Sequence, residues 1–252
     1  MYKAPHAFDR PFPITFYSTS RDIVWPQFAY PYREQPFSSL LAAILVTIIP
    51  ISVILFTQTW VRSFYDAANA ILGLTYAMVT GTFIIVVLKK TIGGLRPHFL
   101  SVCEPIIPGD IAGSGFQNIM FTIEQVCTGT DKKKIGYAIE SFPSGHAEAL
   151  FAGFVYLSIY LSSHLGVQSE YRVSYWRMIA CVLPMLLVTY LSSFLVLTYH
   201  HHHYDVVFGA LIGILVALFG YRMMFRSVWN GESNAVPSLH NYRPDDEGKL
   251  PR

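Results

Sequence analysis

Charged residues are scarce in this chain. Asp, Glu, Lys and Arg make up only 13% of its 252 residues, whereas 52% of the residues are hydrophobic and the mean hydropathy is +0.38. Soluble domains usually carry about 25% charged residues, so this composition excludes an ordinary soluble globular protein. It indicates a chain that lies in a membrane.

A secretory signal is also lacking. Residues 1–36 do not show the charged start, apolar middle and small-residue cleavage site of such a signal. They are rich in aromatic residues and proline and too polar to cross a bilayer, so we expect an N-terminal segment that does not span the membrane. Cysteines are few, three in all. Cys181 falls inside an apolar run, where we expect it only to pack.

Long apolar runs are what the chain does contain. A helix needs about 20 mostly apolar residues to cross the hydrocarbon core of a bilayer. Five runs approach or exceed this length: 37–56, 67–88, 144–163, 178–197 and 206–225. Because backbone groups in lipid must pair internally, we expect an all-α integral membrane helical bundle of about five transmembrane helices. The transmembrane domain then covers 37–225, with a long extramembrane loop at 91–142 and a polar C-terminal tail at 226–252.

Unusual polar residues gather near the ends of these runs. If successive spans alternate in direction, the end of the second, the start of the third and the connection between the fourth and fifth share one membrane face. The residues there are Lys89, Arg96, Ser144, Gly145, His146, His201 and Asp205. Ionisable residues at such positions are costly, so we expect them to be functional.

This set of residues has the chemistry of an anion site. Lysine and arginine supply charge, and a helix that begins at Ser144 and Gly145 presents free backbone N–H groups. His146 is placed to give or take a proton near neutral pH. Asp205 follows His201 by four residues, a spacing that puts both on one face of a helix and lets the carboxylate orient the imidazole. The sequence therefore predicts a phosphate site with a candidate nucleophile.

Three ordered motifs carry a family resemblance. They are GGLRPHFLSVCEP at 93–105, with Lys89 ahead of it, SFPSGH at 141–146, and His201 followed by Asp205. Over roughly 30–225 the chain resembles the type 2 phosphatidic acid phosphatases, also called lipid phosphate phosphatases. That family commonly has six spans, of which the first is missing among the five found here.

The resemblance implies a phosphohydrolase that needs neither metal nor cofactor. His201 would attack phosphorus, Asp205 would orient His201, and His146 would protonate the departing alkoxide. The phosphate oxygens would be held by Lys89, Arg96, Ser144 and Gly145. The resemblance also places the site on the lumenal or extracellular face, where Cys103 and Cys127 could form a disulfide.

The third motif departs from the family pattern. It normally begins Ser-Arg, with five residues between that arginine and the nucleophilic histidine, but Phe194 and Leu195 stand at these positions. Loss of one such phosphate donor typically slows a reaction about 100- to 1000-fold. Arg177 and Arg222 lie roughly 20 residues away along their helices, on the order of 25 Å, which is too far to substitute.

Other residues are candidates to compensate, and two further positions also differ. The candidates are Lys90, Lys132, Lys133, Lys134, His200 and His202. Thr198 stands where the family often has aspartate, and Glu148 stands where a small residue is usual. A metal ion shared by His201 and Asp205 is an alternative, but adjacent helical residues point about 100° apart, so the four histidines cannot all face one ion. We expect no metal.

The sequence as a whole predicts a lipid phosphate phosphatase that acts through a phosphohistidine. Its substrate would be phosphatidate, lysophosphatidate, a sphingoid phosphate, diacylglycerol pyrophosphate or a prenyl diphosphate, and we expect no nucleic-acid partner. Because Leu195 replaces the arginine, a catalytically silent lipid-binding relative, or an enzyme repurposed for one prenyl diphosphate, stays open as the alternative. We expect an integral protein of the endoplasmic reticulum, vacuole, Golgi or plasma membrane.

Overall fold

The structure is a computed structural model that describes residues 12–13, 26–35, 38–106, 113–115, 118, 120–169 and 172–238. Most of the segment expected at 1–36, parts of the loop 91–142 and the tail beyond 238 therefore lie outside the described residues. The chain forms two compact units. The first unit comprises Met1–Ser38, Thr82–Ala147 and Tyr190–Gly209, and the second comprises Ser39–Gly81, Glu148–Thr189 and Ala210–Arg252.

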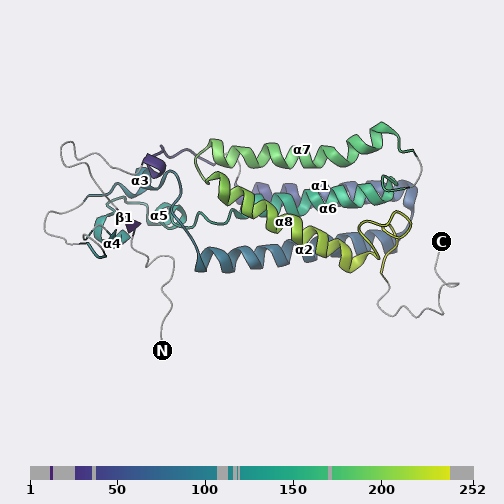
Figure 1. Cartoon of the computed structure of the whole chain (residues 1–252), viewed down its shortest axis with the longest axis horizontal. Coiled ribbons are helices and arrows are strands. Elements are labelled where there is room, and N and C mark those ends of the chain that lie inside the picture. The colour runs from purple at the N-terminus through teal and green to yellow at the C-terminus, as the bar shows by residue number, and fades with distance from the viewer. Residues whose placement is uncertain are drawn as a thin grey trace, which may run out of the picture. The chain divides into compact units, whose positions relative to one another are not determined.

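Five long helices account for most of the described chain (Figure 1). They are α1 (Ser39–Val61), α2 (Phe64–Thr91), α6 (Gly145–His164), α7 (Tyr175–Leu197) and α8 (His203–Met224). Each coincides with one of the apolar runs to within a few residues, which confirms the expected all-α bundle. The second helix continues past its apolar run through Lys89 and Lys90, because lysine is a good helix former.

Four of these helices, all except α6, are long and apolar enough to cross a membrane. Helix α6 is less apolar because it carries His146, Glu148 and His164. Its aromatic side chains are nonetheless enclosed by protein, since Tyr156 and Tyr160 are fully buried. The third expected span is therefore a helix whose polar groups face protein, where they cost less than in lipid.

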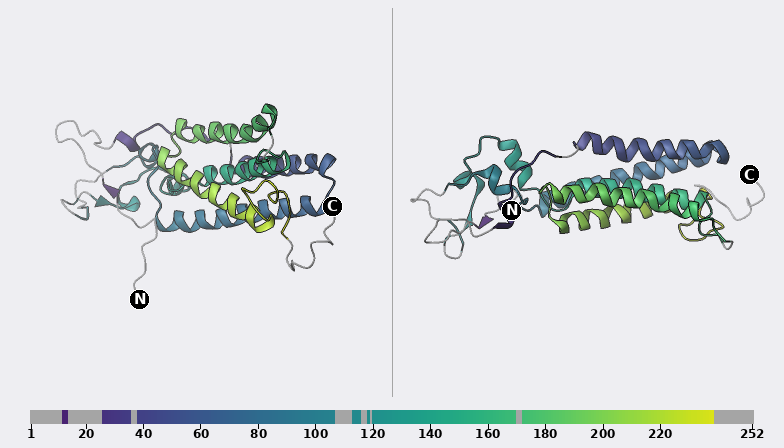
Figure 2. Two further views of the ribbon diagram at one scale, coloured as in Figure 1. Left: turned by 45° about the vertical axis from the view of Figure 1, so that its right-hand side comes forward. Right: turned by 90° about the horizontal axis from the view of Figure 1, so that it is seen from above.

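Helices α6 and α8 run side by side (Figure 2), and in the second unit glycines let the helices approach closely. A Cβ atom at Gly213 of α8 would lie 2.4 Å from the Glu148 carbonyl oxygen of α6, and one at Gly220 would lie 2.6 Å from the Gly73 carbonyl oxygen of α2. In lipid the hydrophobic effect does not drive helices together, so close backbone packing through small residues replaces it.

A buried polar network connects α1, α2 and α6 in the second unit. The Asp66 carboxylate accepts hydrogen bonds from Tyr160 Oη at 2.7 Å and Gln58 Nε2 at 2.9 Å. His164 Nε2 lies 3.1 Å from the other carboxylate oxygen of Asp66. A buried carboxylate is tolerated only when it is paired, so these contacts fix the three helices at this position.

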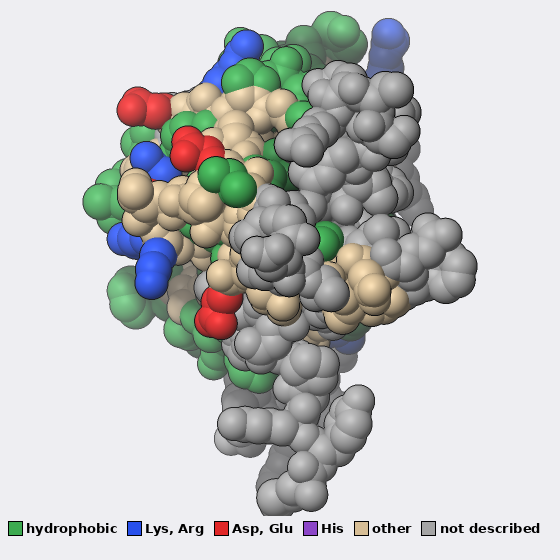
Figure 3. Space-filling model, turned by 90° about the vertical axis from the view of Figure 1, so that its left-hand side faces the viewer, with side chains coloured by type: hydrophobic (Ala, Val, Ile, Leu, Met, Phe, Trp, Pro, Cys, Tyr) green, Lys and Arg blue, Asp and Glu red, His purple; other side chains and the backbone are tan. Residues whose placement is uncertain are grey.

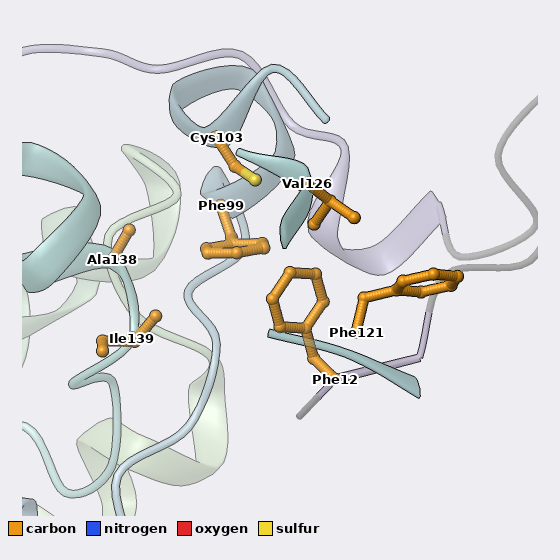
Figure 4. Packing of buried hydrophobic residues seen from close by; sticks show 7 residues of the cluster. All are labelled: Phe12, Phe99, Cys103, Phe121, Val126, Ala138 and Ile139. Atoms are coloured by element: carbon orange, nitrogen blue, oxygen red, sulfur yellow. The ribbon is translucent and has the colours of Figure 1, made fainter. Parts of the chain in front are cut away.

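The first unit contains the short elements of the N-terminal segment and of the long loop. They are α3 (Phe99–Cys103), α4 (Ile123–Val126), α5 (Lys132–Ala138), the 3-10 helix Pro26–Phe28, and the antiparallel strands β1 (Phe12–Pro13) and β2 (Met120–Phe121). Seven buried residues form their core (Figure 4): Phe12, Phe99, Cys103, Phe121, Val126, Ala138 and Ile139. Cys103 and Cys127 form a disulfide, as the resemblance implied.

Charges on the outer face of α3 to α5 are mixed. Seen from that side, the described Lys, Arg, Asp and Glu side chains are interspersed among hydrophobic ones (Figure 3). Lys134 pairs with Asp131, whose side chain also accepts backbone N–H groups as the N-cap of α5. The lysines at 132–134 thus belong to a solvated helix end, and the cations relevant to an anion site are the buried ones.

Candidate active site

All seven site residues expected from the sequence lie in the first unit. Lys89 lies in the last turn of α2, and Arg96 precedes α3. Ser144, Gly145 and His146 stand at the start of α6. His201 lies in the turn between α7 and α8, and Asp205 is in the first turn of α8. The structure brings these segments together, because the Ser144 N–H donates to the Asp205 carbonyl at 3.0 Å.

The turn that carries the histidines is a helix C-cap in which Tyr199 takes the left-handed conformation, with φ of 61°. The Tyr199 N–H donates to the Val196 carbonyl, and the His200 N–H donates to the Leu195 carbonyl at 3.1 Å, which is the Schellman pattern. That conformation costs a non-glycine residue roughly 1–2 kcal/mol. Stacking of Tyr30 on the Tyr199 ring, with centroids 4.4 Å apart, helps to hold it.

The turn directs two of the four consecutive histidines inward. His200 and His201 are 2% and 1% exposed, and both backbone N–H groups donate to the Leu195 carbonyl. His202 instead donates from Nε2 to the Leu95 carbonyl at 3.1 Å, and His203 is exposed at the start of α8. The motif spacing singled out His201, but it could not show that His200 is buried and His203 exposed, since that depends on the turn.

His201 and Asp205 form a buried pair. His201 Nδ1 lies 3.5 Å from Asp205 Oδ2. We expected the two on one face of a helix, which is wrong in detail because His201 precedes α8. The Asp205 carboxylate is held by Ser141 Oγ at 2.5 Å and by the His202 N–H at 3.0 Å, so it is fixed before it meets the imidazole.

Both ring nitrogens of His201 are buried and neither makes a close hydrogen bond among the described residues: Nδ1 faces Asp205 Oδ2 at 3.5 Å, and Nε2 has no partner. Burial lowers the pKa of His201 below its usual range, the Asp205 carboxylate opposes this shift, and Arg96 and Lys89 reinforce it. The imidazole is therefore neutral, and with Nδ1–H directed at the carboxylate its lone pair is on Nε2. Such a nitrogen is a nucleophile.

Two cations lie near these histidines. Arg96 is 5% exposed, its Nε has no partner among the described residues, and burial lowers its pKa to about 10, so it stays charged. Lys89 is partly buried and donates weakly to the Glu140 carbonyl at 3.4 Å. Both cations act electrostatically on His146 and on His201. Lys90 is turned outward and pairs with the Glu140 carboxylate at 2.5 Å, so it does not compensate for a missing donor.

The start of α6 contributes a helix N-terminus to the same place. Ser144 is fully buried, and its Oγ accepts the Ala147 N–H at 3.4 Å as an N-cap would. A Cβ at Gly145 would lie 3.3 Å from Ile85 Cγ2 and 3.8 Å from Lys89 Cε, so the glycine lets α6 begin close to the lysine stem. A helix N-terminus and two cations together favour an anion.

Sequence reasoning missed three neighbours of this site. Ser141 holds Asp205, although no pattern marks it beyond its place before Pro143 and Ser144. His98 is 3% exposed, and its ring centroid lies 5.1 Å from that of His200. Tyr32 was assigned only to a polar N-terminal segment, but its N–H donates to Ser101 Oγ and its ring packs against His98.

Leu195 is 2% exposed, so the position of the missing arginine is filled by a buried apolar side chain. The two arginines considered as substitutes are held elsewhere, in the second unit. Arg177 donates to the Leu165 carbonyl and Arg222 donates to the Phe225 carbonyl. The described residues contain no group of three or more His, Cys, Asp or Glu side chains that could hold a metal ion.

Comparison with known proteins gives a consistent result. The PAP2 superfamily profile matches residues 70–229. The chain is 32% identical over 159 residues to diacylglycerol pyrophosphate phosphatase 1 of Saccharomyces cerevisiae, covering 62% of this chain and 52% of that protein. It is 33% identical over 198 residues to lipid phosphate phosphatase 2 of Arabidopsis thaliana, covering 78% and 64%.

A third similar protein is a putative phosphatidate phosphatase of Drosophila melanogaster, 32% identical over 133 residues, which cover 52% of this chain and 34% of that protein. The matched segments span between about a third and two thirds of the length of these three relatives. No solved structure matches the chain significantly.

Proposed function

The chain belongs to the PAP2 superfamily, and we propose that it is an integral membrane phosphatase that removes phosphate from a lipid phosphomonoester or diphosphate. The observation that carries the proposal is the buried Nε2 of His201, which has no hydrogen-bond partner among the described residues. Asp205 lies on the Nδ1 side of the ring, and Arg96 and Lys89 are nearby. A neutral nucleophile beside buried cations is the arrangement that phosphoryl transfer requires.

In the first step, the His201 Nε2 lone pair forms a bond to phosphorus as the bond from phosphorus to the lipid oxygen breaks. Asp205 accepts the Nδ1–H of His201 and stabilises the positive charge that develops on the imidazole. Arg96, Lys89, the Ser144 hydroxyl and the Gly145 N–H bind the non-bridging oxygens, whose charge they stabilise. His146, which is neutral before substrate binds, takes up a proton beside the bound phosphate and donates it to the departing oxygen.

In the second step, water attacks the phosphohistidine. His146, now neutral, takes a proton from that water, the bond between phosphorus and Nε2 breaks, and inorganic phosphate leaves. His201 returns to its neutral state and His146 is again protonated. The cycle needs no group beyond these side chains and water.

The substrate class follows from the relatives and from the membrane. Similar proteins are named for diacylglycerol pyrophosphate, lipid phosphate and phosphatidate. Four helices of this chain are apolar enough to lie in lipid. We therefore propose an amphipathic substrate whose chains stay in the bilayer while its phosphate reaches His201. Phosphatidate, lysophosphatidate, sphingoid phosphates, diacylglycerol pyrophosphate and prenyl diphosphates satisfy this description.

The disulfide supports a lumenal or extracellular site. Cys103 and Cys127 are in the same unit as His201, and disulfides persist in oxidising compartments. The endoplasmic reticulum, the vacuole, the Golgi and the cell surface all offer such a face.

Phosphate release from purified protein in mixed micelles tests the function. Each lipid class is supplied in turn to wild type, to His201→Ala and to His203→Ala, the last being a matched control because His203 is exposed at the start of α8. We expect the control to match wild type and His201→Ala to lose activity. An acid-labile phosphoenzyme should form from labelled substrate in wild type and not in His201→Ala. Equal phosphate release by wild type and His201→Ala would overturn the proposal.

A further inference from the structure

Four consecutive histidines have four different roles in the structure, and one remains without an explanation. His202 donates a hydrogen bond from Nε2 to the Leu95 carbonyl, and its ring stacks on Tyr204 with centroids 4.9 Å apart. His203 is exposed. His201 faces Asp205. His200 is buried next to the proposed phosphate site, although the mechanism above does not use it.

The hydrogen bonds of His200 identify its tautomer. Its Nδ1 lies 3.0 Å from the Thr198 carbonyl oxygen. A carbonyl can only accept, so Nδ1 carries a proton and the lone pair of the neutral ring is on Nε2. His98 shows the same arrangement, with Nδ1 donating to the Tyr199 carbonyl at 2.8 Å. Consecutive carbonyls of one turn therefore fix two adjacent imidazoles by the same nitrogen and leave the second nitrogen of each available.

The groups that face His200 come from every segment packed around it. Arg96 and His98 approach from the segment before and at the start of α3, His146 from α6, and the Tyr32 ring, 6.1 Å away between centroids, from the N-terminal segment. Burial, His98, Arg96 and His146 lower the pKa of His200 to about 4, and the bond to Thr198 opposes them.

We propose that His200 is a substrate-binding residue that takes up a proton when a phosphate dianion binds beside Arg96, and that His98 positions its ring. This inference rests on the proposed function and names a specificity determinant for the same site. The buried Leu195 side chain cannot supply charge there, whereas a protonated His200 would donate from Nε2 to a phosphate oxygen.

The physical reason for a titratable donor is the cost of buried positive charge. The site already contains two largely buried cations, Arg96 and Lys89. A third permanent cation would be repelled by both, with no anion to offset the repulsion until phosphate binds. A bound dianion reverses the sign of the local field, so the pKa of His200 rises on binding. Proton uptake is then coupled to phosphate binding, and affinity must fall as the pH rises towards the pKa of the complex.

Inorganic phosphate is the probe. Its dissociation constant is measured by calorimetry on the purified full chain in detergent, at pH values from about 5.5 to about 8.5, for wild type, His200→Gln, His200→Arg and the control His203→Gln. Glutamine keeps a neutral donor, so it removes only the titration. Phosphate itself titrates in this range, and His200→Gln serves as the reference that contains this effect.

We expect wild type to bind phosphate about tenfold more tightly than His200→Gln at the acidic end, because a charged donor is stronger than a neutral one. This advantage should disappear at the alkaline end. His200→Arg should stay tight throughout the range, and His203→Gln should follow wild type. Thermal unfolding of each variant checks that it is folded, and if His200→Gln is not, the comparison of His200→Arg with wild type carries the test.

The same wild-type and His200→Gln affinities at every pH, with phosphate release intact, would overturn the role of His200 and leave the proposed function standing. No phosphate binding by any variant, together with no phosphate release from any lipid, would instead reject the proposed function. The two failures are therefore distinguishable.

Discussion

Individual hydrogen bonds decide which side chain at the site is available for chemistry. Asp205 already accepts from Ser141 and from the His202 backbone, so it can hold His201 in one orientation without moving. Arg96 and His201 each keep a buried nitrogen without a partner among the described residues. Such groups are costly in a folded protein unless a ligand satisfies them, which is why these two define the proposed phosphate position.

Asp205→Asn tests the orienting role. An amide in place of the carboxylate can present its NH2 to His201 Nδ1, which favours the wrong tautomer, and it stabilises the developing imidazolium poorly. We expect the rate of phosphate release at saturating substrate to fall at least about 100-fold, with the Michaelis constant changed little. Asp131→Asn, which alters an exposed N-cap of α5, should leave the rate unchanged. A normal rate in Asp205→Asn would remove this residue from the mechanism.

At the scale of elements, close helix packing and a covalent link hold the site segments. Gly213 lets α8 approach α6, and the disulfide ties α3 to the end of α4 within the first unit. Arg96 depends on this unit, since its N–H donates to the Ala138 carbonyl at the end of α5. The sequence predicted the long helices but treated 91–142 as one loop. Elements of four to seven residues have no reliable pattern, because long-range packing stabilises them.

Gly213→Ala tests the helix contact. The new Cβ would meet the Glu148 carbonyl of α6 at 2.4 Å, and backbone atoms cannot move aside as a flexible side chain would. We expect a loss of about 1–3 kcal/mol in stability, seen as a lower midpoint of thermal unfolding in detergent. Leu215→Ala on the same helix, where the side chain is 53% exposed, is the control and should shift the midpoint less.

Removing the disulfide should loosen the segment that carries Arg96. For a link between residues 24 apart, the double variant Cys103→Ala, Cys127→Ala is expected to lose about 3 kcal/mol, by a chain-entropy estimate. Phosphate release should then fall at temperatures where the wild type is still active. Cys181→Ala, which removes the free thiol of α7, is the control. Unchanged thermal stability of the double variant would show that the disulfide contributes nothing to this unit.

At the scale of the whole molecule, the chain is an integral membrane protein whose helices alternate in direction if each spans the bilayer. The N-terminal segment, the loop 91–142 and the histidine turn then share one face. In the described part of the first unit, the N-terminal segment does contact the loop, since the Tyr30 N–H donates to the Pro97 carbonyl. The same alternation would place segment 165–174 and the chain after α8 on the other face, which is an expectation from the sequence.

Glycosylation mapping tests the orientation. An acceptor site inserted after Lys133, which is exposed in α5, should be modified in cells because we place this face in the lumen or outside. An acceptor added after residue 238 should not be modified. A mobility shift removed by a glycosidase reports the modification. The reverse pattern would put His201 in the cytosol and contradict the proposed location.

The sequence by itself determined that the chain lies in a membrane and which residues are candidates for the site. Apolar runs of about 20 residues specify membrane helices because hydropathy and helix length are local properties, and the motif spacing named Lys89, Arg96, Ser144, Gly145, His146, His201 and Asp205. Only the tertiary structure decided how the other three of the four histidines are placed. That choice depends on the left-handed Tyr199 and on partners about a hundred residues away, such as Leu95 for His202 and Tyr199 for His98, with separations of 107 and 101. No local pattern encodes contacts of that range, because folding alone brings the partners together.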